Sequence, residues 1–219
     1  MPYEQLLENG RYFRRLKGMK VREALEKKGY KAVYVDTGRE AFNLVLDLVP
    51  PGTRVGVGGS VTIRQLGLLE ALRERGHEVY DHWDPSLTRE QEEQARRAHL
   101  TCDVFLTSTN AITKDGTLIN IDFSGNRVAA MIFGPRRTVI VAGINKIVED
   151  VDAGIKRVRN VVSPPTFRRR KMDHPCTEAG FCIDCRRPDR PCRVITILEA
   201  RPAANPDFHV ILVGEELGY

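Results

Sequence analysis

Short apolar runs alternate with helix-like segments along almost the whole of this 219-residue chain. The runs that we predict to be strands are Lys31–Val35, Arg54–Val57, His77–Asp81, Asp103–Thr107, Leu118–Ile121, Thr138–Ala142, Val194–Leu198 and His209–Val213. The helical patterns are Leu16–Lys28, Ala41–Val49, Val61–Arg75, Thr88–Leu100 and Val148–Val161. Strands and helices in this alternation form right-handed β-α-β units. Because many strands are continuously apolar, the sequence predicts an α/β fold whose mainly parallel sheet has helices on both faces.

Three local signals refine this prediction. Thr88 and Gln91 have the spacing of a capping box, which begins a helix. Pro164-Pro165 is expected to lie beyond the end of the last predicted helix. Lys114-Asp115-Gly116 is a turn signal, so this segment could be a simple hairpin that leads into the strand after it.

Composition excludes several classes of protein. Hydrophobic residues make up 42% and charged residues 29% of the chain, which is typical of globular domains. No apolar run approaches the ~20 residues of a membrane span, and the first residues lack the apolar core of a secretory signal. We therefore expect a cytoplasmic protein with no membrane partner. The net charge of +5 is mostly interspersed, and we interpret the run Arg168–Lys171 as a solvated surface rather than a nucleic-acid site.

A glycine loop, Val55–Thr62, follows one predicted strand and opens a helix. Ser60 is placed to cap that helix, and the free N–H groups and the helix dipole behind it favour an anion such as phosphate or carboxylate. The loop lacks the third glycine of GxGxxG and the GK[ST] of a P-loop. A tight turn with an ordinary cap is the alternative interpretation.

Further polar residues follow three other predicted strands. Thr107 and Asn110 come at the carboxyl end of Asp103–Thr107, where open α/β sheets bind ligands. Asn126, Arg127 and Lys146 could complete a site for an anionic substrate. Arginine offers a planar fork to a carboxylate or phosphate, and lysine offers a point charge. Spacing alone leaves a surface role open for each of them.

The five cysteines form two groups, one isolated residue and a cluster of four. Cys102 stands alone before a strand, and we expect it to be a core residue. The other four fall in one short stretch, as Cys176, Cys182, Cys185 and Cys192. Four close thiols in an intracellular chain indicate a metal site, for either an iron–sulfur cluster or zinc. A single CxxC with outlying cysteines on each side favours the cluster, with His174 as a possible substitute ligand.

Four runs, VGVGGSVTIRQLGLLEAL, DVFLTSTNAITKDGTLINIDFSGNRVAAMIFGP, CTEAGFCIDCRRPDRPC and HVILVGEELGY, resemble the LUD-domain (lactate-utilisation) family, in its cysteine-bearing single-domain branch. The resemblance implies a fold similar to the ribose-phosphate isomerase, glucosamine-phosphate deaminase and CoA-transferase group. It assigns ligand binding to Gly56, Gly58, Gly59, Ser60, Thr62 and Asn120. It covers nearly the whole chain, which implies a single domain over residues 1–219. Composition sets apart a metal-binding insertion at about 164–193, which is rich in Pro, Arg, Asp and Cys and poor in aliphatic residues.

Those isomerases carry an acidic residue just before the ligand-site segment, where this chain has Ser108-Thr109-Asn110. This departure disfavours isomerase chemistry. Asp115 is one of the nearest acids, and with Asn126, Arg127 and Lys146 it makes up our candidate catalytic set.

Three functions stay open. The first is a redox protein of hydroxy-acid (lactate) metabolism, which would be an oxidoreductase component with a [4Fe–4S] cluster, a small anionic metabolite as ligand and iron–sulfur or flavin partner subunits. The second is a cofactor-free sugar-phosphate or acyl-type enzyme with structural zinc. The third is a non-catalytic ligand-binding regulator. A homo-oligomer is compatible with all three.

Overall fold

A six-stranded sheet forms the centre of the protein in a computed structural model that describes residues 3–219. Its strand order is β1 (Lys31–Val35), β10 (Phe208–Val213), β7 (Arg137–Gly143), β4 (Val104–Thr107), β2 (Arg54–Val57) and β3 (Glu78–Asp81). Every neighbouring pair in this sheet is parallel. The prediction of a mainly parallel α/β sheet is therefore confirmed.

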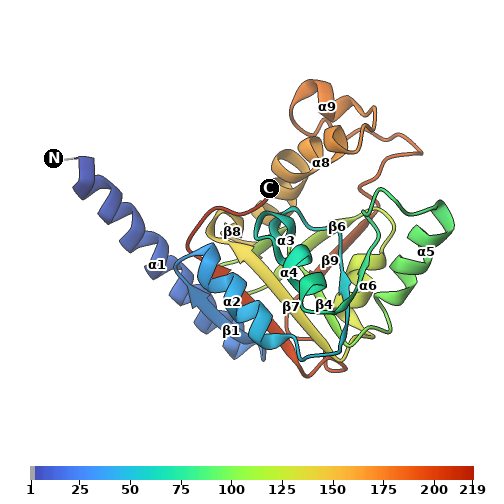
Figure 1. Cartoon of the computed structure of the whole chain (residues 1–219). Helices are drawn as coiled ribbons and strands as arrows, with labels where there is room; N and C mark the ends of the chain where they lie inside the picture. The colour runs from blue at the N-terminus through green and yellow to red at the C-terminus, as the bar shows by residue number, and fades with distance from the viewer. Residues whose placement is uncertain (1–2) are drawn as a thin grey trace.

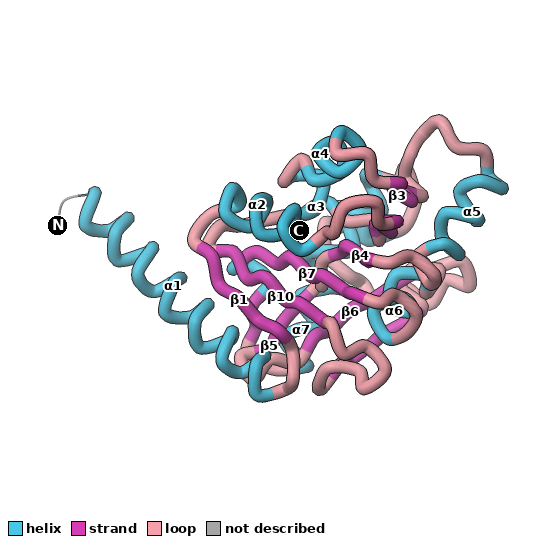
Figure 2. Tube along the Cα trace, turned by 60° about the horizontal axis from the view of Figure 1, so that its bottom comes forward, coloured by secondary structure: helices cyan, strands magenta, loops and turns pink. Residues whose placement is uncertain are grey.

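Helices cover both faces of this sheet, and two apolar clusters fill the spaces between (Figures 1 and 2). The helices are α1 (Tyr3–Lys27), α2 (Gly38–Leu48), α3 (Val61–Gln65), α4 (Leu68–Glu74), α5 (Arg89–Ala98) and α6 (Asn126–Ile132). Strand β7 shows how both faces are buried, because Val139 and Val141 enter one cluster while Ile140 enters the other. Continuous apolar strands are the consequence of this two-sided burial.

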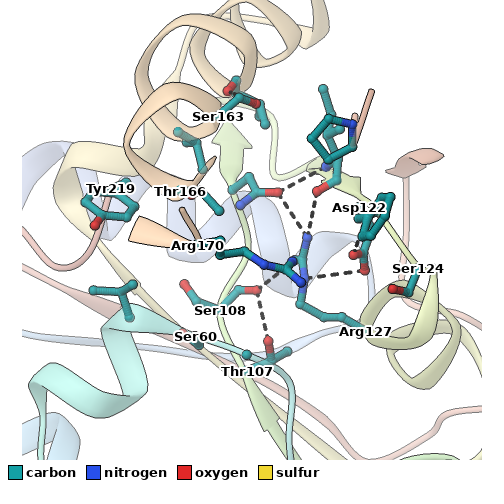
Figure 3. Close-up of a pocket in the computed structure, with 18 of the residues that line it drawn as sticks. Ser60, Thr107, Ser108, Asp122, Ser124, Arg127, Ser163, Thr166, Arg170 and Tyr219 are labelled. Atoms are coloured by element: carbon teal, nitrogen blue, oxygen red, sulfur yellow. Dashed lines mark hydrogen bonds and ion pairs between the residues drawn. The ribbon is translucent and has the colours of Figure 1, made fainter. Parts of the chain in front are cut away.

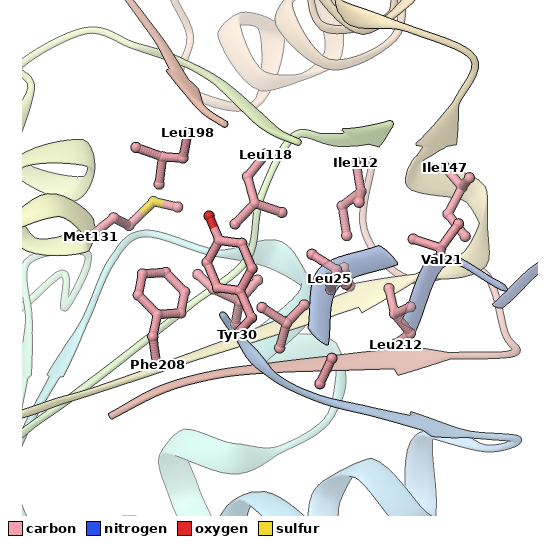
Figure 4. Packing of buried hydrophobic residues seen from close by; sticks show 14 of the residues in the cluster. Val21, Leu25, Tyr30, Ile112, Leu118, Met131, Ile147, Leu198, Phe208 and Leu212 are labelled. Carbon is pink, nitrogen blue, oxygen red and sulfur yellow. The ribbon is translucent and has the colours of Figure 1, made fainter. Parts of the chain in front are cut away.

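A second sheet of four short strands packs against one face of the first (Figure 4). It consists of β8 (Ile147–Val148), β5 (Ala111–Thr113), β6 (Leu118–Asp122) and β9 (Val194–Leu198), in that order. Ile112 and Leu118 of this sheet meet Leu25 of α1 in the shared core. Strands β5 and β6 are antiparallel, and Gly116 takes a φ of +85° in the turn between them. The hairpin interpretation of Lys114-Asp115-Gly116 is thus confirmed.

The predicted final helix does not stop before the proline pair. Helix α7 (Val151–Arg157) runs through a π-helical segment, Val158–Val162, into α8 (Ser163–Arg169). The N–H of Ser163 donates to the carbonyl of Val158, five residues back, and Pro164 and Pro165 follow in the first turn of α8. A short α9 (Pro175–Ala179) comes next. The sequence prediction was wrong here because the wider π turn lets two residues without N–H groups continue the helical path.

Two other predicted helices differ from the structure by more than a few residues at one end or by an internal break. The pattern Val61–Arg75 is divided into α3 and α4 at Gly67, whose φ is +72°. Helix α1 begins at Tyr3, well before Leu16, and its first turns project from the body of the molecule (Figure 1). Within residues 3–219, no helix combines the length and apolar character needed to cross a membrane.

Candidate functional site

A crevice with a volume of about 140 Å³ opens beyond the carboxyl ends of the central strands. Its floor comes from the β2–α3 loop, the segment after β4, and the 3₁₀ turn Ile144–Lys146 that follows β7. Helix α8 lies over it, so that Ser163 and Thr166 face Ser60 and Ser108 across the opening (Figure 3). Parallel α/β sheets bind ligands at this end of their strands.

Lys146 is the buried cation of the floor, with only 4% of its surface exposed. Its Nζ donates to Thr62 Oγ1 at 2.9 Å and to Ser108 Oγ at 2.8 Å. Among residues 3–219, no Asp or Glu carboxylate lies within 4.0 Å of this amine, so its charge lacks an acidic partner. Burial, together with the charges of Arg157 and Arg127, lowers the pKa of Lys146 to about 7.

The guanidinium of Arg127 is bonded to protein groups rather than free to bind a ligand. Its guanidinium donates to Asn120 Oδ1 at 2.6 Å, to Asn110 Oδ1 at 3.1 Å and to the carbonyl of Ile121 at 3.0 Å. The Asp122 carboxylate lies 3.7 Å from its Nε. These contacts use most of its donors, so Arg127 joins the segment after β4 to the end of β6.

The glycine loop shapes the floor mainly through close packing. The N–H groups of Gly58 and Gly59 donate to Leu106 and Val57 carbonyls, so neither faces a ligand. A Cβ at Gly58 would lie 2.6 Å from the Phe105 ring. Ser60 Oγ accepts from the N–H of Ile63 and caps α3, which is only 5 residues long. Hydroxyl groups and Lys146, rather than a long helix dipole, therefore supply the polar character of this floor.

The crevice brings together most of the site residues expected from the sequence. Its lining includes Gly59, Ser60, Thr62, Thr107, Asn110, Asn126, Arg127 and Lys146. Gly56, Gly58 and Asn120 lie behind the lining, where Asn120 holds Arg127. Asp115 is not brought to the crevice, because it lies in the β5–β6 turn and binds Lys28 at 2.8 Å.

Other lining residues were not expected from the sequence. They include His82, Trp83, Arg96, Ser108, Ser163, Thr166, Arg169, Arg170 and Tyr219. Burial lowers the pKa of His82 to about 3 and that of the adjacent His99 to about 4, so both imidazoles are neutral near pH 7. The run Arg168–Lys171 is exposed, as expected, and two of its arginines, Arg169 and Arg170, also line the crevice. Only their chemical type could have suggested that second position.

The four clustered cysteines line a second, smaller cavity of about 20 Å³, together with His174. All four are free thiols, and Cys176 is buried. Burial raises the pKa of Cys176 and of Cys192, and the proximity of the other thiols adds to the shift. The N–H of Asp184 donates to Cys182 Sγ at 3.4 Å. Backbone N–H groups of this kind stabilise thiolate ligands.

The donor set fits a thiolate-bound metal, although the sulfurs are not gathered into a finished coordination sphere. Across residues 3–219, no three His, Cys, Asp or Glu side chains lie close enough together in this conformation to bind a metal ion. Three of the thiols, Cys182, Cys185 and Cys192, are on coil segments that follow α9. Binding of a metal would require these segments to move closer together around the cavity. Cys102 is separate and buried, and burial raises its pKa to about 11, as expected for a core residue.

The two cavities share one wall. Ser163 and Phe167 of α8, and Pro191 and Cys192 beyond the CxxC, line both of them. Phe167 is itself buried and has an edge contact with the His174 ring at 5.8 Å between centroids. Cys192 thus lines both the crevice and the thiol cavity.

The protein is an α/β domain with a crevice beyond the carboxyl ends of its parallel strands, the place where ligands commonly bind in such sheets. A family model for the LUD domain matches residues 18–213. The chain belongs to the LUD-domain family, as its motifs indicated.

A solved structure shares this fold. It is the crystal structure of a DUF162 family protein from Deinococcus radiodurans, with a TM-score of 0.55 and 17% sequence identity. The match covers 91% of this chain and 98% of that one. No curated protein matches the chain significantly. The structural likeness, at this identity, concerns the fold alone.

Proposed function

We propose that this LUD-domain protein acts in hydroxy-acid metabolism as a redox protein, which binds a small carboxylate in the crevice and an iron–sulfur cluster on Cys176, Cys182, Cys185 and Cys192. The observation that carries the proposal is the shared wall, because Cys192 lines both cavities. A carboxylate ligand and a redox centre on these thiols would lie side by side.

Lys146 supports the carboxylate half of the proposal. A buried amine without an acidic partner is costly, and an anion in the crevice would supply that partner. Ser108 and Thr62 already orient the amine through their hydroxyl groups. The charged amine already makes charge-assisted hydrogen bonds to these neutral hydroxyls. A carboxylate would add the attraction between opposite charges, which a neutral group lacks.

The cysteine cavity supports the redox half. Its thiols are soft ligands, and the Asp184 N–H bond to Cys182 is of the type that tunes cluster potentials. Arg159 and Arg190 line the same cavity and would offset the negative charge of four thiolates. A bound cluster would supply one-electron chemistry beside the ligand. The chain's own part is to hold the ligand with Lys146 and to separate the two cavities with Phe167 and Pro191.

Calorimetric titration of lactate into the purified full chain tests the carboxylate half. Lys146→Met is expected to weaken binding at least about tenfold, because a hydrogen bond to a charged group contributes roughly 1.5–3 kcal/mol. Lys156→Met is the matched control, since Lys156 is exposed on α7 and does not line the crevice. Equal affinity in wild type and Lys146→Met would remove the basis of the proposal.

A further inference from the structure

The crevice contains more positive charge than a monocarboxylate can balance. Its lining includes five cationic side chains, those of Arg96, Arg127, Lys146, Arg169 and Arg170, and one acidic side chain, that of Asp122. Arg96 is paired with Glu92 and Glu93 on its own helix, and Arg127 lies 3.7 Å from Asp122. The other three cations have no Asp or Glu carboxylate within 4.0 Å among residues 3–219.

These three cations lie on opposite sides of the opening. Lys146 belongs to the floor, where it contacts Ser108 and Thr62. Arg169 and Arg170 end helix α8, which forms the roof. Residues 163, 166 and 170 are spaced by three and four along this helix, and Figure 3 shows Ser163, Thr166 and Arg170 on the side that faces the crevice.

Aromatic rings restrain the two roof arginines. The Arg169 guanidinium lies 4.0 Å from the Trp83 ring centroid, and Arg64 lies 4.9 Å from it. Arg64 is fixed in turn by two bonds to Asp81, at 2.6 and 2.8 Å. Arg170 lies 5.8 Å from the Phe123 ring. Cation–π contacts use the face of a guanidinium and leave its N–H edge for an anion.

We propose that the crevice binds a small metabolite with an anionic group at each end, a carboxylate at Lys146 and a phosphate at Arg169 and Arg170. The point charge of a lysine suits a carboxylate in a narrow floor, whereas two guanidinium forks suit the several oxygens of a phosphate. This inference rests on the proposed carboxylate site and adds the substrate class, namely a phosphorylated hydroxy acid.

The test compares two probes by calorimetric titration into the full chain: lactate, with one anionic group, and 3-phosphoglycerate, with a carboxylate and a phosphate. Wild type is expected to bind 3-phosphoglycerate at least about tenfold more tightly than lactate. Arg170→Ala is expected to abolish most of that difference and to change lactate affinity less than about twofold, because lactate does not reach the roof.

Arg168→Ala is the matched control, because Arg168 is as exposed as Arg170 and lies on the same helix, but it does not line the crevice. It removes the same charge and should leave both affinities unchanged. The inference is overturned if 3-phosphoglycerate binds no more tightly than lactate, or if Arg168→Ala and Arg170→Ala have equal effects. In those cases Lys146-dependent lactate binding would still support the proposed function, whereas the absence of binding by either probe would contradict both. Thermal melts check that each variant is folded.

Discussion

Lys146 is the residue on which the proposed carboxylate site depends most. The sequence indicated it only as a cation after an apolar strand, with a surface role still open. The 3₁₀ turn after β7 buries it beneath Ser108 and Thr62. No pattern in the sequence reports that burial, because it depends on how segments far apart in the chain pack together. For the same reason, the positions of Trp83 and Arg169 could not be predicted.

The depressed pKa of Lys146 predicts a defined pH dependence for the proposed carboxylate site. A carboxylate interacts favourably with the charged amine, and in the ligand-free protein that amine loses its proton around a pKa of about 7. Lactate stays ionised above that pH, so its affinity should fall by up to about tenfold per pH unit as pH rises beyond 7. Calorimetric titrations between about pH 6 and pH 9 measure this fall. Lys146→Met should give a flat profile, and a flat profile in wild type would refute the role of the amine.

At the scale of elements, the β2–α3 loop was predicted as a strand–turn–helix unit, and it is one. Its capping serine could be read from the sequence, and Ser60 does cap α3. The close contact between Gly58 and the Phe105 ring could not be read, because Phe105 lies on another strand. Helix α8 was not predicted, because its proline pair is typical of the end of a helix. The π turn that precedes it has no signal that could be recognised in the sequence.

Gly58→Ala tests whether this loop depends on packing. The added Cβ would lie 2.6 Å from the Phe105 ring, which is buried and cannot move freely. Overpacking of this kind should lower the free energy of unfolding by about 1–3 kcal/mol, measured by chemical denaturation. Gly10→Ala is the control, because a Cβ at Gly10 meets nothing within 4 Å in an exposed part of α1. Equal stability of Gly58→Ala and wild type would show that the contact is relieved at no cost.

For the whole molecule, the alternation of strands and helices was enough to predict a mainly parallel sheet with helices on both faces. Its division into a six-stranded and a four-stranded sheet was not predictable, since an apolar run such as Leu118–Ile121 indicates a strand but not its partners. The cysteine spacing indicated a metal site, and the fold brings those thiols to one small cavity beside the crevice.

The central claim is that this LUD-domain protein carries an iron–sulfur centre beside its ligand crevice. Iron and sulfide analysis of anaerobically purified full-length protein, with an absorption spectrum, tests it most directly. We expect about four irons and four sulfides per chain and a broad band at roughly 400 nm. Cys185→Ser should lose both, whereas Cys102→Ala, which changes the buried core cysteine, should keep them. A colourless protein with stoichiometric zinc, or iron content unchanged in Cys185→Ser, would contradict the claim.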